Sequence, residues 1–100
     1  MKRYVLFVNT DTDYYLYPVS SFVGAVYYSA TQTYLYFEKA PLSIKVLLTH
    51  ENLKGPNFLI ALGNLFNNSA ENVIVFNDLD KSYATDYVTA VSSITKVVIK

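Results

Sequence analysis

His50 is the only histidine of the chain and stands beside Glu51, the one place where the sequence offers a general base with a residue to orient it. The nearest hydroxyl nucleophiles, Ser43 and Thr49, belong to the same predicted strand, and no Gly-x-Ser-x-Gly motif is present. A lone histidine at a strand end is typical of a solvated or capping residue. These residues form no convergent catalytic set, so we predict that the chain is not an enzyme.

Two acidic pairs, Asp11-x-Asp13 and Asp78-x-Asp80, lie in predicted turns and offer the oxygen ligands that calcium uses. A dedicated calcium loop needs more ligands and a glycine at its sharp turn, which neither stretch supplies. We interpret both pairs as side chains that cap their own turns, with a bound ion as the alternative. The chain has no cysteine, and its three glycines stand too far apart for a phosphate-binding loop. We therefore predict no metal site and no cofactor.

Tyrosines are concentrated on three consecutive predicted strands. They are Tyr14, Tyr15, Tyr17, Tyr27, Tyr28, Tyr34 and Tyr36. Side chains two apart in a strand share a face, so these rings could form a ladder on which single-stranded nucleic acid stacks. Such binding also needs a basic groove, but the eight Lys and Arg residues are scattered and the net charge is zero, which makes nucleic acid an unexpected partner. Cross-strand pairs, or an aromatic interface with another subunit, explain the ladder with fewer assumptions.

Residues 56–68 predict the helix around which the fold is organised. Their apolar side chains recur at i, i+3, i+4, i+7 and i+8, the stripe of a helix with one buried face. This stripe consists of Phe58, Ala61, Leu62, Leu65 and Phe66. Pro56 suits the first helical turn, and Asn67-Asn68 suits its end. We expect this helix to lie across a sheet and to contribute Phe58, Leu62, Leu65 and Phe66 to the core.

Most of the remaining chain has the composition and alternation of β-strands. The predicted strands cover 2–9, 14–17, 22–29, 33–39, 42–50, 72–77 and 85–99. In the first of them, Tyr4, Leu6 and Val8 share one face, and Val5 and Phe7 share the other. The pattern predicts a single α+β domain over residues 1–100, with about seven mainly antiparallel strands and one helix packed on them.

Several residues predict local features within these strands. Pro18 cannot donate to a ladder, so it ends its strand or places it at an edge. Gly24 marks a bulge or a close crossing, residues 29–32 form a hairpin turn, and Ser92-Ser93 bends the last strand or divides it in two.

The low content of charged residues indicates what kind of surface the folded chain has. Charged residues are 16% of the chain, against about 25% in an ordinary soluble domain. Because the net charge is also zero, repulsion protects the chain poorly against self-association. We expect a homo-oligomer or lattice, with a monomer that has a neutral, tyrosine-rich surface as the alternative. The apolar run 5–8 is too short for a signal peptide or a membrane span, so we expect no membrane association.

The second half of the chain carries short motifs in a fixed order. A strand that ends in Thr49-His50 precedes the helix, the strand Asn-Val-Ile-Val-Phe-Asn-Asp follows at 72–78, and Thr-Asp-Tyr-Val-Thr-Ala-Val-Ser-Ser-Ile covers 85–94. This order resembles a class of small proteins encoded among the structural genes of marine tailed phages. The resemblance implies a capsid-decorating, stabilising or tail-associated virion component that is made in the host cytoplasm and present in many copies. It brings no catalytic or ligand-binding residues.

Together these features predict a non-enzymatic viral structural protein that acts through contacts with its own copies or with other virion proteins. The alternatives are a monomeric binding module for single-stranded nucleic acid or a small ligand, and a small phage regulator of a host protein. The candidate contact residues are Tyr14, Tyr15, Tyr17, Tyr34, Tyr36, Val97 and Ile99.

Overall fold

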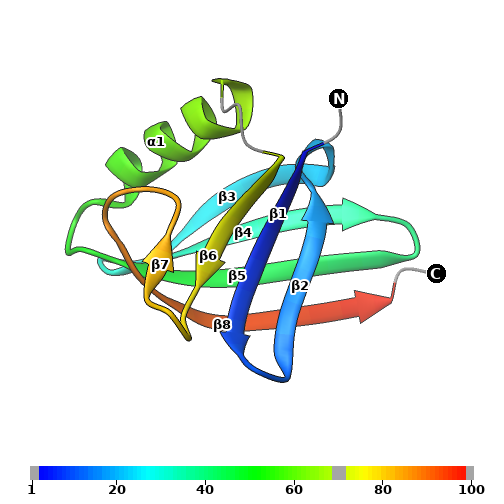
Figure 1. Ribbon diagram of the computed structural model, residues 1–100. Helices are drawn as coiled ribbons and strands as arrows, with labels where there is room; N and C mark the ends of the chain where they lie inside the picture. Colours follow the sequence, from blue (N-terminus) through cyan, green and yellow to red (C-terminus); the bar gives the residue numbers. More distant parts are fainter. Residues whose placement is uncertain (1–2, 69–71, 99–100) are drawn as a thin grey trace.

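The computed structural model describes residues 3–68 and 72–98, which form eight strands in two sheets and one α-helix (Figure 1). The elements are β1 (Tyr4–Thr10), β2 (Asp13–Pro18), β3 (Phe22–Ser29), β4 (Gln32–Lys39), β5 (Leu42–His50), α1 (Gly55–Asn68), β6 (Val73–Asn77), β7 (Ser82–Tyr83) and β8 (Val88–Val98). A single 3-10 turn, Val19–Ser21, links β2 to β3. The predicted α+β class, with mainly antiparallel pairing and one helix, is confirmed.

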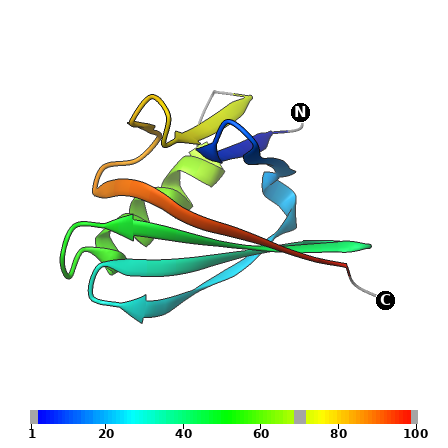
Figure 2. The ribbon, with the colours of Figure 1, turned by 90° about the horizontal axis from the view of Figure 1, so that it is seen from below.

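The strands divide into sheet A, with the order β2-β1-β6-β7, and sheet B, with the order β3-β4-β5-β8. All described pairs are antiparallel except β1 with β6. This parallel pair arises because α1 carries the chain from β5 in sheet B to β6 in sheet A, and parallel strands need such a crossover. The inner faces of the two sheets enclose the core, with α1 at one end (Figures 1 and 2).

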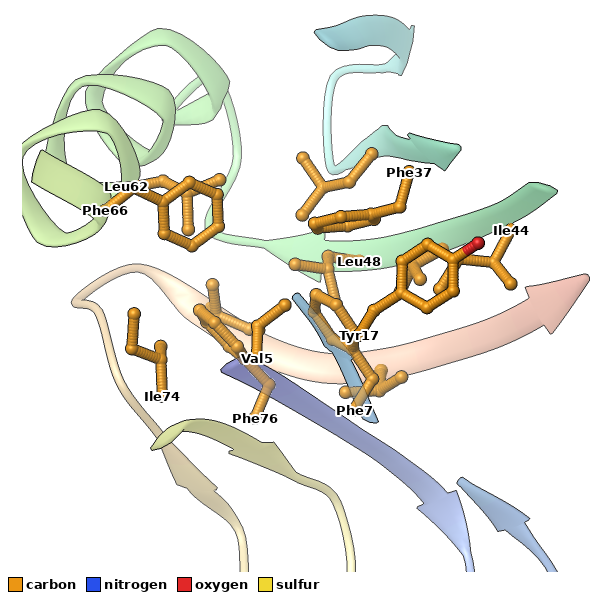
Figure 3. Close-up of a cluster of buried hydrophobic side chains, with 14 of the residues drawn as sticks. Val5, Phe7, Tyr17, Phe37, Ile44, Leu48, Leu62, Phe66, Ile74 and Phe76 are labelled. Carbon is orange, nitrogen blue, oxygen red and sulfur yellow. The ribbon is translucent and has the colours of Figure 1, made fainter. Parts of the chain in front are cut away.

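Aromatic side chains join the two sheets in the core (Figure 3). Phe7 of sheet A stacks on Phe76 with ring centres 5.4 Å apart and meets Phe37 of sheet B edge-on at 5.6 Å. Val5, Ile44 and Leu48 are fully buried around them. Since Phe7, Phe37 and Phe76 are inaccessible to solvent, this cluster holds the sheets in one fixed arrangement.

Helix α1 begins and ends within one residue of its prediction and packs on sheet B. Phe58, Leu62 and Phe66 are buried, and Leu65 is half-buried against the same cluster. The Phe66 ring lies 5.3 Å from the Phe22 ring and meets it edge-on. Arg3, just before β1, donates hydrogen bonds to the backbone carbonyls of Leu65 and Phe66. These bonds satisfy carbonyl acceptors at the C-terminus of α1.

The predicted local features are also present. The β3–β4 register shifts between Phe22 and Gly24, which is a bulge, and residues 30–31 form the hairpin turn that follows β3. The β5–β8 register shifts beside Ser92, so β8 is one bent strand and not two. Pro18 ends β2 at an edge of sheet A.

Candidate protein-contact surfaces

The structure divides the predicted tyrosine ladder between the two sheets. Tyr14, Tyr15 and Tyr17 lie on β2 of sheet A, whereas Tyr34 and Tyr36 lie on β4 of sheet B. The prediction was wrong because β2 and β3 are adjacent in the chain but pair with different strands. No single aromatic ladder crosses all three strands.

Tyr17 is a core residue, so its prediction as a contact residue was wrong. Its side chain is 4% exposed, and its hydroxyl donates to the carbonyl of Leu42, the first residue of β5, at 2.8 Å. Burial raises its pKa above the ordinary tyrosine value. Tyr15 shares this inward face and is half-buried, with its ring centre 5.2 Å from that of Tyr17. The ammonium of Lys96 lies 5.6 Å from the centre of the Tyr15 ring.

The outer face of sheet A is apolar across three strands. The register places Leu6 of β1 between Leu16 of β2 and Val75 of β6. Side chains two positions away fill the rows on either side. The outer face of sheet A comprises Tyr4, Leu6, Val8, Tyr14, Leu16, Val73 and Val75. Tyr14 is 59% exposed and Leu16 51% exposed, and none of these outward side chains on the described strands is charged.

The outer face of sheet B has a different chemistry. Its tyrosines form a cluster in which the Tyr28 and Tyr36 rings lie 5.2 Å and 6.1 Å from the Tyr34 ring. The ammonium of Lys45 lies 4.7 Å from the centre of the Tyr34 ring. Val97, another predicted contact residue, is exposed on this face opposite Ser43. Ile99 lies outside the described residues.

Beside this aromatic cluster, three polar side chains from three strands meet. Gln32 of β4 donates to the Thr49 hydroxyl of β5 at 3.3 Å, and Thr49 is hydrogen-bonded to Ser92 of β8. The bulge in β8 turns Ser92 to this side. Sheet B therefore presents hydroxyl groups, an amide and aromatic rings, whereas the outer face of sheet A presents mainly aliphatic groups.

No similarity to a known family model, curated protein or solved structure was found. The geometry of this chain therefore carries the functional argument.

The sequence predicted that His50 is either solvated or a capping residue, and its burial excludes the first. It is 3% exposed, its Nδ1 lies 2.9 Å from the Glu51 backbone carbonyl, and its Nε2 lies 2.9 Å from Thr33 Oγ1. Since a carbonyl only accepts, Nδ1 donates to Glu51, and Nε2 is hydrogen-bonded to the Thr33 hydroxyl. The ring also stacks on Phe58 at 6.1 Å. Nε2 thus joins β5 to β4, and the ring face contacts α1 through Phe58. The Glu51 group that meets the ring is its backbone carbonyl.

The two acidic pairs serve as turn residues in the described structure. Asn9 donates to Asp13 across the β1–β2 turn, and Asn77 donates to Asp80 after β6. Asp78 accepts from the Tyr83 hydroxyl and from the Val91 backbone amide at 3.0 Å, which ties the β6–β8 connection to β8. Burial, followed by the hydrogen bond and charge of Asp78, raises the pKa of Tyr83 to about 12.

Among the described residues, no group of three or more histidine or acidic side chains is placed to hold a metal, and no helix is long and apolar enough to cross a membrane. Two hollows flank Pro18 and Ser20. One of about 370 Å³ lies beside β2 and is lined partly by Tyr15, Leu16 and Lys39. The other, of about 450 Å³, lies between Arg3, Phe22 and the end of α1.

Sequence reasoning missed Leu6, Leu16, Val73 and Val75 as surface residues. A signal for them was present, because β1 and β6 are apolar at nearly every position. Such continuous runs are typical of strands that are covered on both faces. In this chain the outer face of sheet A is partly exposed: Leu16 is 51% and Val73 41% exposed, whereas Leu6 and Val75 are half-buried and Val8 is buried.

Proposed function

We propose that the chain is a non-enzymatic structural subunit that binds other proteins through the outer face of sheet A. The observation that carries this proposal is that β1 and β6 have apolar side chains on both of their faces. Val5, Phe7 and Ile74 face the core, whereas Leu6 and Val75 face outward with no covering element among the described residues. A contiguous exposed apolar surface without charge is typical of a protein-contact site.

The dimensions of this face indicate what kind of contact it makes. Three strands spaced about 4.8 Å apart, each with about five residues of 3.3 Å, span roughly 14 Å by 17 Å. The corresponding area, roughly 240 Å², is smaller than the roughly 800 Å² that each partner contributes to a standard stable interface. A subunit that holds its place through several such contacts at once fits this size, since simultaneous contacts multiply the strength of binding.

The setting we propose is a virus particle, where the chain decorates the capsid or is otherwise virion-associated after synthesis in the host cytoplasm. The resemblance of residues 44–94 to phage structural-gene products supports this setting. The charge composition supports it as well, because a neutral surface suits a packed lattice. Mass spectrometry of purified particles should detect the chain in many copies. Its absence from particles would contradict the setting, though not the contact function.

The contact function is tested by placing a charge on the outer face of sheet A. A tagged Leu16→Lys chain should lose co-sedimentation with purified particles, because a lysine would have to be buried without a partner. Val97→Lys, at an equally exposed position on sheet B, is the matched control and should bind as wild type does. Thermal melts would verify that both variants fold. Equal binding of the two variants would contradict the use of this face.

A second candidate function is supported by the aromatic cluster on sheet B. Tyr28, Tyr34 and Tyr36, with Lys45 over one ring, form a platform on which unpaired bases could stack. Fluorescence titration with a single-stranded oligonucleotide at two salt concentrations tests it. Binding that weakens steeply with salt and is lost in Tyr34→Ala would support it, and no binding at low salt would exclude it.

A further inference from the structure

The backbone groups along the open edges of the two sheets differ in how they are protected. Each sheet has two edge strands, β2 and β7 in sheet A and β3 and β8 in sheet B. An edge strand presents unpaired N–H and C=O groups that can accept a strand from another chain, unless proline, charge, shortness or a covering group prevents it. Comparison of the four edges shows one that is unprotected.

Strands β7 and β8 are protected. β7 has only two residues, which is too short to template a partner strand. Side chains of the β6–β8 connection cover the beginning of β8, because Asp78 accepts from the Val91 amide and the Tyr83 hydroxyl donates to the Thr89 carbonyl at 3.1 Å. Lysine at position 96 adds charge to the other half of β8.

Strand β2 is protected by proline and by neighbouring lysines. The Val19 amide donates to the Arg3 carbonyl, whereas the Tyr4 amide donates to the carbonyl of Asn72, just before β6. Even-numbered residues of β2 therefore direct their backbone groups to the open edge. One of these is Pro18, which has no N–H. Lys39 lines the hollow beside β2, and Lys96 lies over Tyr15.

Strand β3 has no proline, charge or covering group at its edge. Its register with β4 shifts between Phe22 and Gly24 and between Tyr27 and Ser29, and the stretch from Gly24 to Tyr27 between these shifts pairs regularly. Its eight residues, Phe-Val-Gly-Ala-Val-Tyr-Tyr-Ser, include no charge and no proline. Val26 is 53% exposed and Tyr27 75% exposed. In Figure 2, β3 is the outermost strand of sheet B on the side away from sheet A, and no other element lies beyond it.

The hydrogen-bond pattern identifies which β3 residues face the open edge. The His50 amide donates to the Thr31 carbonyl, so odd-numbered residues of β4 bond to β5 and even-numbered ones bond to β3. Val26 lies opposite Tyr34 and is therefore bonded to β4. The N–H and C=O groups of its neighbours, Ala25 and Tyr27, consequently point to the open edge.

We infer that β3 pairs antiparallel with β3 of a second copy about a two-fold axis at Val26. In this register Ala25 lies opposite the second copy's Tyr27 and Tyr27 opposite its Ala25, so the two chains exchange four backbone hydrogen bonds. The two Val26 side chains meet at the axis. The result is one continuous eight-stranded sheet whose outer face joins the two tyrosine clusters. This inference rests on the proposed function and specifies one contact of the subunit with its own copy.

Charge favours a second copy over another partner at this edge. A two-fold axis brings each residue close to its own counterpart, so a charge near the axis would face a like charge. β3 carries no charge, whereas the same operation at β2 would bring Lys39 and Lys96 toward their counterparts. One strand pair buries less than a standard interface, so the dimer should be reversible and depend on concentration.

Charge variants at the axis test this pairing, with light scattering on a sizing column across a concentration series. Wild type should approach twice the 11.3 kDa chain mass as concentration rises. Val26→Lys and Val26→Glu should each weaken dimerisation about tenfold, because like charges lie directly opposite each other. An equimolar mixture of the two variants should dimerise again. The Val97→Lys variant, on the same face but at the opposite edge, is the control and should dimerise like wild type.

A cysteine at the axis tests the register independently of charge, since the chain has no native cysteine. Directly opposed residues that are not hydrogen-bonded to each other have Cα atoms about 4.5 Å apart, within disulfide range. Oxidised Val26→Cys should therefore give a covalent dimer, and Leu16→Cys on β2 should not. A wild type that stays monomeric, a Val26→Lys chain that dimerises normally, or a charge mixture without rescue would each overturn the pairing. Dimerisation abolished by Leu16→Lys alone would overturn it too, but would support the proposed contact on sheet A.

Discussion

Sheets A and B share one core but present different surfaces to their surroundings. The outer face of sheet A is aliphatic and uncharged, and its β2 edge is protected by Pro18 and nearby lysines. The outer face of sheet B carries tyrosines, hydroxyl groups and Lys45, and its β3 edge is unprotected. Sheet A thus exposes a face but protects an edge, whereas sheet B exposes an edge beside a more polar face.

This difference indicates two kinds of contact in one small chain. A face without charge binds by removing apolar area from water, and it favours any partner of complementary shape. An open edge binds through backbone hydrogen bonds, and it favours an extended strand in a fixed register. A subunit with both can join its own copy at one site and a different protein at the other.

The largest effect that we predict is a difference in the free energy of unfolding between variants on the inner and outer faces of sheet A. Tyr17→Ala should lower the free energy of unfolding by about 3–5 kcal/mol, because it leaves a cavity in the core and removes the hydroxyl that bonds to Leu42. Tyr14→Ala, on the outer face of the same strand, should change it by less than about 0.5 kcal/mol. Urea denaturation measures both values. Similar losses in the two variants would contradict the assignment of inner and outer faces.

The alternation of side chains, which is encoded locally, accounts for most of what the sequence predicted correctly. The 3.6-residue spacing of Phe58, Leu62 and Phe66 located α1, and the glycine and proline positions located the bulge in β3 and the end of β2. Alternation also grouped Tyr15 with Tyr17, but it could not show that their face points inward. That depends on which strands pair, and β2 pairs with β1 and not with β3.

Contacts between residues far apart in the sequence explain the features that the sequence did not predict. The parallel contact of β1 with β6 joins residues about seventy positions apart, and no local pattern encodes it. The burial of His50 depends on Thr33 and Phe58, which come from a different strand and from the helix. Among the contact residues, Tyr14, Tyr34, Tyr36 and Val97 were placed on outer faces, whereas Val26 gains its role only from its position on an open edge.

A smaller effect is predicted at the connection that protects β8. Asp78→Ala should lower the free energy of unfolding by about 1–3 kcal/mol, because the Val91 amide loses its acceptor and the Tyr83 hydroxyl keeps only the Thr89 carbonyl. Asp80→Ala, in the same turn but exposed, is the matched control and should cost less than about 0.5 kcal/mol. Chemical denaturation at neutral pH compares the two. An equal loss of stability in the two variants would mean that the Asp78 side chain does not hold the β6–β8 connection against β8.

The smallest effect should be visible only at high pH. The pKa of Tyr83 rises from 10.0 to about 12 on folding, so the folded chain retains this proton in a range where the unfolded chain has lost it. Its contribution to stability is therefore complete below pH 10 and is lost as the pH rises toward 12. Denaturation midpoints measured from pH 9 to pH 12 should fall less steeply for Tyr83→Phe than for wild type. Identical slopes would contradict the role of the Tyr83–Asp78 pair.

Amide hydrogen exchange, measured residue by residue at low and high protein concentration, tests the difference between the two edges most directly. At low concentration the amides of Ala25 and Tyr27 on β3 should exchange rapidly, as should those of Tyr14 and Leu16 on β2, since all four point to an open edge. At high concentration we predict that Ala25 and Tyr27 become protected, while Tyr14 and Leu16 do not. Protection of the β2 amides in place of the β3 amides, or no change at either edge, would contradict this account.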